Sequence, residues 1–422
     1  MDYLRLFRLP WFFGILFLIS VPPGICLASP DQAGWDALWA NRFLDAENEF
    51  EKALQADEKN MAAWRGLMLA RNALGRDTSL ENDLEKYSKG APHSDYDLLL
   101  LSWLDSHNSL RNKKYFETLA EFASKVAEAE NLDLVDRRMG WDSLVGYYRL
   151  LGKTGDVKKC RDNLNRISDW RILGPFDNTA GSGHIKDFID INYVPASAQY
   201  VGKFGQKITW FNPQLVDLGG EIAPLGYFYQ KANTTAYART QVRLKEAGRY
   251  LLSMGYEGDM DVYLNGVLIV QVSRSGGGGE VIQKLVDLPA GWTNITCKVS
   301  NRDRYAGFTC SLSMADGSEI KDLEVDPSMD GHTVFDPSGM ETLESRMLAG
   351  IEKGVTENPA SAEAAFWNLL RARQGGDGEE LLELCKTCLL YTSPSPRDNI
   401  ANLVSRHLLE KRGGGGGGGG GG

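Results

Sequence analysis

Three carboxylates alternate along one short stretch of the sequence, at Glu257, Asp259 and Asp261. In an extended segment, alternate side chains project to the same side. Calcium binds about six to eight oxygen ligands, so these carboxylates and nearby backbone carbonyls predict a candidate calcium site. The alternative is a solvated acidic strand edge, which would oppose edge-to-edge aggregation. We expect no other cofactor.

Exposed aromatic side chains are a second feature with binding chemistry, because a flat ring can stack on the face of a sugar. Tyr263, Trp292 and Tyr305 are the candidates for weak glycan binding. A fourth ring, Tyr256, falls in an alternating apolar pattern that predicts a buried side chain.

Catalytic motifs are missing from the sequence. It contains no HExxH zinc motif, no G-x-S-x-G nucleophile elbow and no GxxxxGK[ST] phosphate loop. His93, His107, His184 and His332 have no partner at motif spacing, which favours exposed or structural histidines. A glycosidase would need two carboxylates at a defined separation, and no such pair is identifiable.

The stretch 250–316 has the period-two alternation of short β-strands. The apolar positions of its first two strands are Tyr250, Leu252, Met254 and Tyr256, then Met260, Val262 and Leu264. Asn265-Gly266 follows, the kind of dipeptide that readily forms a two-residue hairpin turn. Several short strands separated by turns predict an antiparallel β-sandwich of the jelly-roll type.

Cys297 and Cys310 lie in the apolar alternation of two consecutive predicted strands. If these strands form a hairpin around residues 301–307, Cys297 lies directly opposite Cys310. Directly opposed residues are close enough for a disulfide, which an exported protein could form. The sequence leaves open a disulfide or two buried free thiols.

Several motifs of the β-rich stretch carry a family resemblance. Residues 257–266 (EGDMDVYLNG) resemble the hairpin of galactose-binding-like and protective-antigen-like jelly rolls, and residues 288–299 and 308–317 are similar to their later strands. Residues 170–178 (WRILGPFDN) resemble the entry to this module in large bacterial envelope proteins. Those proteins carry tetratricopeptide repeats before the module and often a transglutaminase-like domain after it. Tyr263 stands where the family usually has Trp, and Asn294 lies one position late.

The N-terminus has the pattern of a secretory signal peptide over residues 1–28. Arg5 and Arg8 precede an apolar run at 11–21, and small residues follow near Ala28. The run is short for a membrane span, although an uncleaved anchor helix is the alternative. We therefore expect an exported protein of the periplasm or outer cell envelope, without a membrane span after cleavage.

The chain is acidic, with a formal net charge of −10 over 422 residues. Cleavage of the signal peptide would remove Asp2, Arg5 and Arg8, a net +1, and leave −11. This balance disfavours nucleic acid and anionic membrane surfaces as partners.

Two helical regions flank the β module. Residues 29–169 have tetratricopeptide-like spacing, with Ala46, Phe50 and Ala53 in one helix and Trp64 in the next repeat. The alternative is a generic helical array. A polar linker follows at 326–339. The sequence then predicts helices at 340–353 and 360–373, within a second repeat region at 340–387.

Residues 388–422 change character. The segment 388–398 (CLLYTSPSPRD) resembles a sequencing-library adapter translated in frame, and the chain closes with ten glycines. We expect this tail to be foreign to the native protein, which would then be truncated near Thr387. The CxxC formed by Cys385 and Cys388 is discounted because Cys388 lies in this tail.

Together these features predict a multidomain α + β protein: a helical arm at 29–169, a jelly roll at 170–325 and a truncated helical region at 340–387. The first function hypothesis is an exported, non-catalytic interaction protein, with helical repeats for a protein partner. The second is the N-terminal part of a transglutaminase-like envelope enzyme, whose catalytic residues would lie beyond 387. The sequence of the native gene beyond codon 387 would distinguish these two hypotheses.

Overall fold

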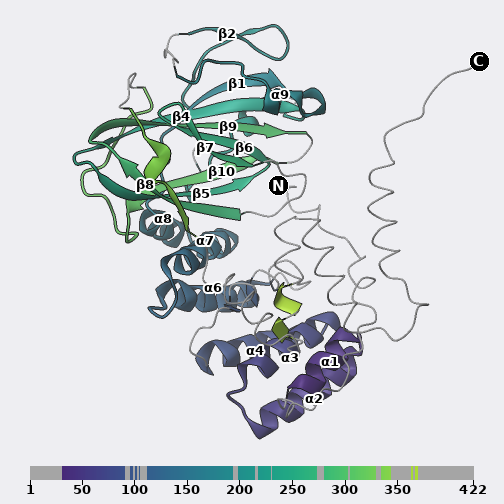
Figure 1. Ribbon diagram of the computed structural model, residues 1–422. Helices are drawn as coiled ribbons and strands as arrows, with labels where there is room; N and C mark the ends of the chain where they lie inside the picture. Colours follow the sequence, from purple (N-terminus) through teal and green to yellow (C-terminus); the bar gives the residue numbers. More distant parts are fainter. Residues whose placement is uncertain are drawn as a thin grey trace, which may run out of the picture. The chain divides into compact units, whose positions relative to one another are not determined.

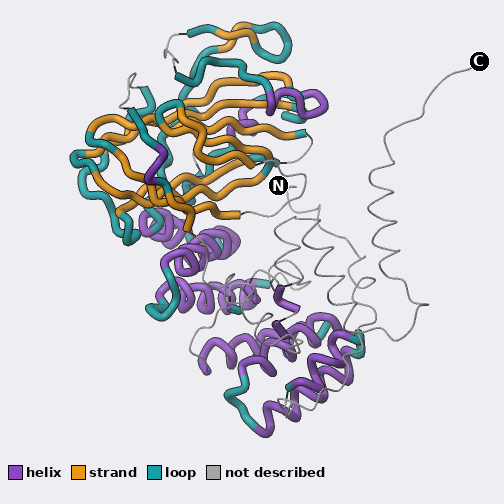
Figure 2. Tube along the Cα trace, viewed as in Figure 1, coloured by secondary structure: helices purple, strands orange, loops and turns teal. Residues whose placement is uncertain are grey.

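The computed structural model describes residues 31–90, 96–97, 100–101, 104, 112–192, 198–213, 217–229, 231–272, 280–302, 305–328, 334–343, 363–364 and 366–368. The expected signal peptide (1–28), the adapter-like tail (388–422) and most of the second helical region (340–387) lie outside these residues. The described chain combines helices with antiparallel sheets, which confirms the mixed α and β class (Figures 1 and 2).

Contacts divide the chain into two compact units. Unit 1 comprises Met1–Thr118 and Met347–Gly422, and unit 2 comprises Leu119–Arg346. The division falls inside helix α6 (Lys113–Glu128) rather than at residue 169. Unit 1 is therefore built from two separate stretches of the chain. In the part that the structure describes, no helix is long and apolar enough to cross a membrane.

Unit 1 begins with four consecutive helices: α1 (Gln32–Trp39), α2 (Phe43–Ala56), α3 (Met61–Ala73) and α4 (Asp77–Gly90). The side chain of Asn60 caps α3 by accepting a hydrogen bond from the backbone N–H of Ala63 at 3.0 Å. Helix α2 contacts both α1 and α3, and α1 also contacts α3. Successive helices therefore stack as pairs.

Phe50 of α2 fills the space between these helices. Its side chain is fully buried, as are those of Ala46 and Ala53, which confirms the predicted inward face of α2. A Cβ built on Gly34 would lie 2.6 Å from the Phe50 ring, and one built on Gly66 would also overlap the ring. Glycine at both positions thus lets α1 and α3 close on the same aromatic ring.

Unit 2 contains two main antiparallel sheets, which Figure 1 shows as two layers. The six-stranded sheet has β1 (Arg171–Asp177), β4 (Thr234–Leu244), β9 (Gly291–Asn301), β6 (Asp259–Leu264) and β7 (Val267–Val272) in that order, with β11 (Glu324–Val325) also pairing with β4. The four-stranded sheet has the order β10 (Gly307–Met314), β5 (Gly248–Glu257), β8 (Glu280–Leu288) and β12 (Glu341–Leu343).

The core of unit 2 lies between these sheets, and it confirms the predicted alternation. The predicted inward side chains of β5, β6, β9 and β10 are all buried in one cluster: Tyr250, Leu252, Met254, Tyr256, Met260, Val262, Leu264, Ile295, Cys297, Val299, Phe308, Cys310 and Leu312. The predicted hairpin turn is also confirmed. Asn265 and Gly266 have φ values of 47° and 84°, and they join β6 to β7.

Helices α7 (Leu134–Leu150) and α8 (Thr154–Asn163) belong to unit 2. Arg149 of α7 donates to Glu221 at 3.1 Å and pairs with Asp217 in a loop of the β-rich part. After α8, the backbone N–H of Ile167 donates to the carbonyl of Cys310 at 2.8 Å on the edge strand β10. These contacts hold both helices against the sandwich.

The predicted hairpin that paired Cys297 with Cys310 is wrong. Strand β9 pairs with β4 and β6, whereas β10 pairs with β5 in the other sheet. The chain crosses from one layer to the other between these strands, so the two cysteines face the core from opposite sheets. Both are buried free thiols.

Two further expectations for the end of the β module are corrected. Residues 341–343, predicted to begin a helix, form strand β12 and pair with β8. The predicted linker 326–339 contains the short 3-10 helix η4 (Pro337–Gly339), and its Phe335 is buried in the sandwich core. Phe335 and its described neighbours therefore pack as part of unit 2.

A long segment between β1 and β4 covers the outer face of the six-stranded sheet, and we call its described residues 178–192 and 198–213 the strap. It contains η2 (Thr179–Gly181), α9 (Ser182–Ile185), β2 (Tyr200–Val201) and β3 (Lys207–Ile208); η3 (Pro224–Tyr227) follows it before β4. Strap residues Ile189, Ile208 and Trp210 form a second apolar cluster with Leu173 and Tyr237 of the sheet. The outer face is therefore partly buried.

Candidate functional site

The three carboxylates predicted to bind calcium are not on one strand. The chain leaves the four-stranded sheet after Glu257, turns at Gly258 with φ of 90°, and enters the six-stranded sheet at Asp259. Alternation therefore does not align Glu257 with Asp259 and Asp261. Among the described residues, no group of three or more His, Cys, Asp or Glu side chains is placed to hold a metal ion.

Asp261 instead belongs to a buried ionic cluster beneath the strap. It lies directly across from Lys298 on β9, and Lys298 lies across from Tyr237 on β4. The Lys298 ammonium donates to the backbone carbonyl of His184 at 2.6 Å and is 3.7 Å from a carboxylate oxygen of Asp187. The His184 Nε2 is 3.6 Å from Asp261 Oδ1. The cluster ties α9 and the following residues to the sheet.

Burial controls the electrostatics of this cluster. It raises the pKa of Asp261, while His184 and Lys298 oppose the rise by favouring the carboxylate. Burial also lowers the pKa of Lys298, against the attraction of Asp261 and Asp187. A buried ammonium beside these oxygens repels a metal cation, so this arrangement anchors the strap rather than forming a calcium site.

The three aromatic candidates for glycan binding do not form one surface. Tyr263 and Trp292 share the outer face of the six-stranded sheet, where they lie across from Thr296 and Arg243 respectively. Four positions of β9 separate these two rows, a spacing of roughly 13 Å, so one sugar ring cannot stack on both. Both rings are half-buried. Burial, with the nearby Asp261 and Asp187, raises the pKa of Tyr263 to about 12.

Tyr305 lies apart from these two, just before β10. Its hydroxyl donates to Glu221 at 2.5 Å, and Glu221 also accepts from Arg149 of α7. The ring remains 45% exposed. Burial and the Glu221 charge raise the pKa of Tyr305. The position of its hydroxyl supports a role in holding α7 to the sandwich.

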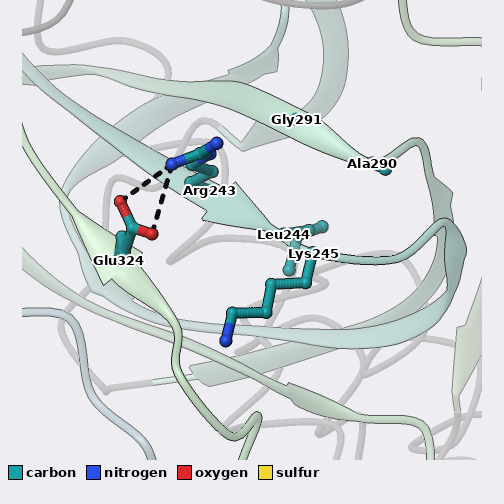
Figure 3. A pocket seen from close by; sticks show the side chains of 6 residues that line it. All are labelled: Arg243, Leu244, Lys245, Ala290, Gly291 and Glu324. Carbon is teal, nitrogen blue, oxygen red and sulfur yellow. Dashed lines mark hydrogen bonds and ion pairs between the residues drawn. The ribbon is translucent and has the colours of Figure 1, made fainter.

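A shallow hollow lies near the end of β4 and the start of β9 (Figure 3). It is lined by Arg243, Leu244, Lys245, Ala290, Gly291 and Glu324. Arg243 pairs with Glu324 at 3.3 Å, and Lys245 pairs with Asp322 at 2.6 Å, all with exposed side chains. No aromatic ring lines the hollow, so it offers no stacking surface for a sugar.

The most developed polar site lies in unit 1, around Arg65 of α3. Arg65 is only 5% exposed. Its Nε donates to the carboxylate of Glu363 at 2.7 Å, and its NH1 donates to the hydroxyl of Tyr87 at 3.2 Å. The guanidinium carbon lies 4.8 Å from the ring centre of Tyr96. The Tyr87 hydroxyl in turn donates to Asp97 at 2.5 Å.

Glu363 is helical and lies much later in the chain than Arg65. We call the described residues 363–364 and 366–368 the resident helix, and we call Trp35, Trp39, Arg65 and Tyr96 the receiving face. Phe366 packs against Trp35 and Trp39, with ring centres 5.9 and 6.0 Å apart. Trp367 is fully buried and lies 6.0 Å from Tyr96. The Trp367 indole N–H donates to Glu363 at 3.2 Å.

The charges at this contact are complementary. Burial acts to lower the pKa of Arg65, but Glu363 and Tyr87 raise it more strongly, so the guanidinium stays charged. Burial and the charge of Asp97 raise the pKa of Tyr87, which therefore stays a neutral hydroxyl. The Glu363 carboxylate of the resident helix thus pairs with this buried cation.

The sequence predicted the helical character of Ala364 and Trp367, which the described residues confirm. It did not identify Arg65 as a binding residue. The available signal was an Arg within the otherwise apolar stretch 61–70 of α3, all of whose positions from Ala63 to Ala70 are buried. Its partner lies 298 positions away, which no local pattern encodes.

No protein-family profile matches this chain, and no curated protein matches it. Among solved structures, it is similar to β-glucosidase from Kluyveromyces marxianus in complex with glucose, with a TM-score of 0.22 and 20% identity over 34% of this chain and 15% of that chain. A selenomethionine-labelled form of that enzyme gives a TM-score of 0.23 and 14% identity over 34% and 17% of the two chains.

A GH31 α-xylosidase from Xanthomonas citri gives a TM-score of 0.21 and 12% identity over 43% of this chain and 18% of that chain. The chain thus spans only 15% to 18% of the length of these three proteins. All three TM-scores are below 0.5, so the likeness carries no argument about what this chain does.

Proposed function

We propose that this chain is an exported, non-catalytic interaction protein whose unit 1 binds a helical segment of a partner protein on the receiving face. The observation that carries the proposal is the buried contact between Arg65 and Glu363, made by a helical piece 298 positions away in the chain. A face that contacts a helix through aromatic rings and a buried charge pair has the chemistry of helix-in-groove recognition.

The packing of unit 1 supports a repeat-type helical array as part of this proposal. Stacked helix pairs with Phe50 between Gly34 and Gly66 agree with tetratricopeptide-like geometry. Such arrays expose one side of their helices as an extended binding surface. In this chain, Trp35 and Trp39 of α1 and Arg65 of α3 come from successive helix pairs and contact the same resident helix.

For unit 2 we propose a jelly roll of the galactose-binding-like class that serves chiefly as a spacer, with weak glycan binding at best. The strap over the outer face and the separation of Tyr263 from Trp292 favour the spacer role. A glycan array probed with the intact protein tests this part. A strong signal that disappears in Trp292→Ala would establish a lectin instead.

The binding role of unit 1 is tested with a phage-displayed library of helical peptides. The target is the full chain carrying Phe366→Ala and Trp367→Ala, which weakens the resident helix. The matched control adds Arg65→Ala to the same chain. We expect peptides to be enriched on the target and lost on the control, because their carboxylate would have no guanidinium to pair with. Enrichment that is equal on both chains, or absent from both, would contradict the proposed function.

A further inference from the structure

We propose that His184 and Asp261 form a proton-dependent clasp, which fastens the α9 end of the strap, residues 178–192, to the six-stranded sheet. The clasp holds this end more tightly when the two side chains share one proton, and it weakens when that proton is lost as pH rises. All of its contacts lie within unit 2, so the clasp does not rest on the binding role proposed for unit 1.

The two side chains face each other from the strap and from strand β6. His184 Nε2 is 3.6 Å from Asp261 Oδ1, and the two side chains are only 11% and 3% exposed. Within the described part of the chain, neither ring nitrogen of His184 has a hydrogen-bond partner, and neither has Asp261 Oδ1. The separation is longer than a hydrogen bond but suits an ion pair. Because buried polar atoms are nearly always paired, the charge of the ring decides whether Oδ1 has a favourable neighbour.

The backbone of His184 is held on both sides of its ring. Its N–H donates to Asn178 Oδ1 at 3.0 Å, and its carbonyl accepts from Lys298 Nζ at 2.6 Å. Asn178 is itself buried, and its Nδ2 donates to the carbonyl of Asn301 at 2.7 Å. These bonds fix the backbone from which the imidazole projects. The ring therefore faces Asp261 whether or not it carries the proton.

Other charged and titratable groups surround the pair on every element that packs there. Helix α9 contacts β1, β4, β9 and η2, and Asp261 adds β6. The groups are Asp177 of β1, Tyr237 of β4, Tyr263 of β6, Lys298 of β9, Asp187 and Lys186 of the strap, and Arg302 beside Gly181 of η2. From β7, the neutral amide of Gln271 hydrogen bonds to Asp261.

Two of these groups bear on which side chain titrates near neutral pH. Burial raises the pKa of Tyr263 to about 12 and also raises the pKa of Tyr237, so both hydroxyls stay neutral. The carboxylate of Asp187 is 75% exposed, so water screens its charge. Burial lowers the pKa of Lys298, which makes its ammonium the alternative source of a pH effect. An experiment must therefore separate His184 from Lys298.

The direction of the pH effect follows from where the proton sits in a closed and in an open strap. In the closed strap, the proton places a charged ring opposite the Asp261 carboxylate, and its loss leaves a buried carboxylate opposite a neutral ring. In an open strap, water solvates the carboxylate in either case. The closed pair therefore binds the proton more tightly, and burial, which raises the pKa of Asp261, acts in the same direction. Closure is strengthened at low pH and weakens as pH rises through the value at which the closed pair releases its proton.

The effect is local because other contacts of the strap do not involve this proton. The backbone N–H of Phe188 donates to the Tyr237 hydroxyl at 3.3 Å, and the Phe188 ring stacks on Phe176 at 4.5 Å. These contacts keep the strap on the sheet when the clasp weakens. We therefore expect a change in the opening of α9 and its neighbours, without unfolding of the sandwich.

Hydrogen exchange of the amides at 182–188 in the full chain tests the clasp at pH 5.5 and 8.0. Each rate is divided by the intrinsic exchange rate at the same pH, which leaves the opening equilibrium. The chains are wild type, His184→Gln and Asp261→Asn, with Ile185→Ala as the matched control on the same helix, since Ile185 is 84% exposed. We expect protection at least about fivefold greater at pH 5.5 in the wild-type and control chains, because histidine changes its charge between about pH 5 and 8. The difference should fall below about twofold in His184→Gln and in Asp261→Asn.

Two results would overturn the clasp. Equal protection of the wild-type segment at the two pH values would do so without any variant. A fivefold difference that persists in a folded His184→Gln chain would assign the pH effect to another group, Lys298 first of all. Circular dichroism establishes that each variant is folded, and if Asp261→Asn does not fold, the wild-type and His184→Gln profiles decide the outcome.

Discussion

The contact between Phe50 and Gly66 predicts that Gly66→Ala destabilises unit 1 in the wild-type chain and stabilises it when Phe50 is also replaced by Ala. Phe50 is fully buried, and its ring packs edge-on against Trp35 at 5.5 Å. Removing the ring with Phe50→Ala should destabilise unit 1 by about 3–5 kcal/mol. Gly66→Ala alone should also destabilise it, because the new methyl group would overlap the Phe50 ring.

The magnitudes follow from two opposing effects at Gly66. Replacing a mid-helix glycine by alanine gains about 1 kcal/mol in helix propensity. Overpacking costs about 1–3 kcal/mol, and here the overlap is with a ring that is held on its other side by Trp35. In the Phe50→Ala background the overlap disappears, so Gly66→Ala should then stabilise by about 1 kcal/mol. The coupling energy equals the overpacking cost, about 1–3 kcal/mol.

Hydrogen exchange of the α2 and α3 amides measures the opening free energy of unit 1 without interference from unit 2. Leu44→Ala, on the same helix as Phe50 but 54% exposed, is the matched control and should change that free energy by no more than about 0.5 kcal/mol. Additive effects of Phe50→Ala and Gly66→Ala would refute the reasoning, because they would mean that α1 and α3 do not close on one ring.

Three further predictions concern unit 2. Lys298→Met should lower the free energy of unfolding of unit 2 by about 3 kcal/mol, because the buried Asp261 would lose the attraction of the ammonium across from it. Adding Asp261→Asn should recover most of that loss in a urea titration. Burial raises the pKa of Asp261, so the folded state binds this proton more tightly than the unfolded chain does. The free energy of unfolding should therefore be highest below the unfolded pKa of about 4 and should decrease as pH rises through the higher folded value; Asp261→Asn should remove this part of the slope, and an unchanged slope would contradict it. Burial raises the pKa of both Cys297 and Cys310, so iodoacetamide should modify these thiols only after unfolding, and a reducing agent should leave Tm unchanged; a Tm that falls on reduction would instead indicate a disulfide.

Local patterns of the sequence predicted the strand faces because alternation is a property of each strand by itself. The buried sets of β5, β6, β9 and β10 and the Asn265-Gly266 turn were all readable in this way. Which strands pair is decided by the tertiary fold. Two residues separated by a sheet crossing, such as Glu257 and Asp259, look adjacent in sequence and yet belong to different layers.

The same limit explains the errors at the candidate sites. Cys297 and Cys310 each face the core as expected, but a hairpin was the simplest connection and the chain instead crosses between sheets. The strap packs on Leu173 and Tyr237 of the outer face, and it is a loop-rich segment with weak periodicity. The Arg65 and Glu363 pair joins parts of the chain on either side of unit 2. Neither the composition nor the spacing of residues in the sequence indicates that contact.

The division of unit 1 between two stretches of the chain has a consequence for how the protein folds. Residues up to 118 leave the ribosome long before residue 363, and all of unit 2 lies between them in the sequence. Trp35 and Trp39 can pack against Phe366 only after that residue has been synthesised. Closing the long loop between them carries an entropic penalty and slows folding. Prior folding of unit 2 would replace most of that flexible loop with a compact body. Folding of unit 2 should therefore speed the folding of unit 1, because it brings the two stretches of unit 1 closer together. Mutations that destabilise the core of unit 2 should slow the folding of unit 1, although they change none of its residues.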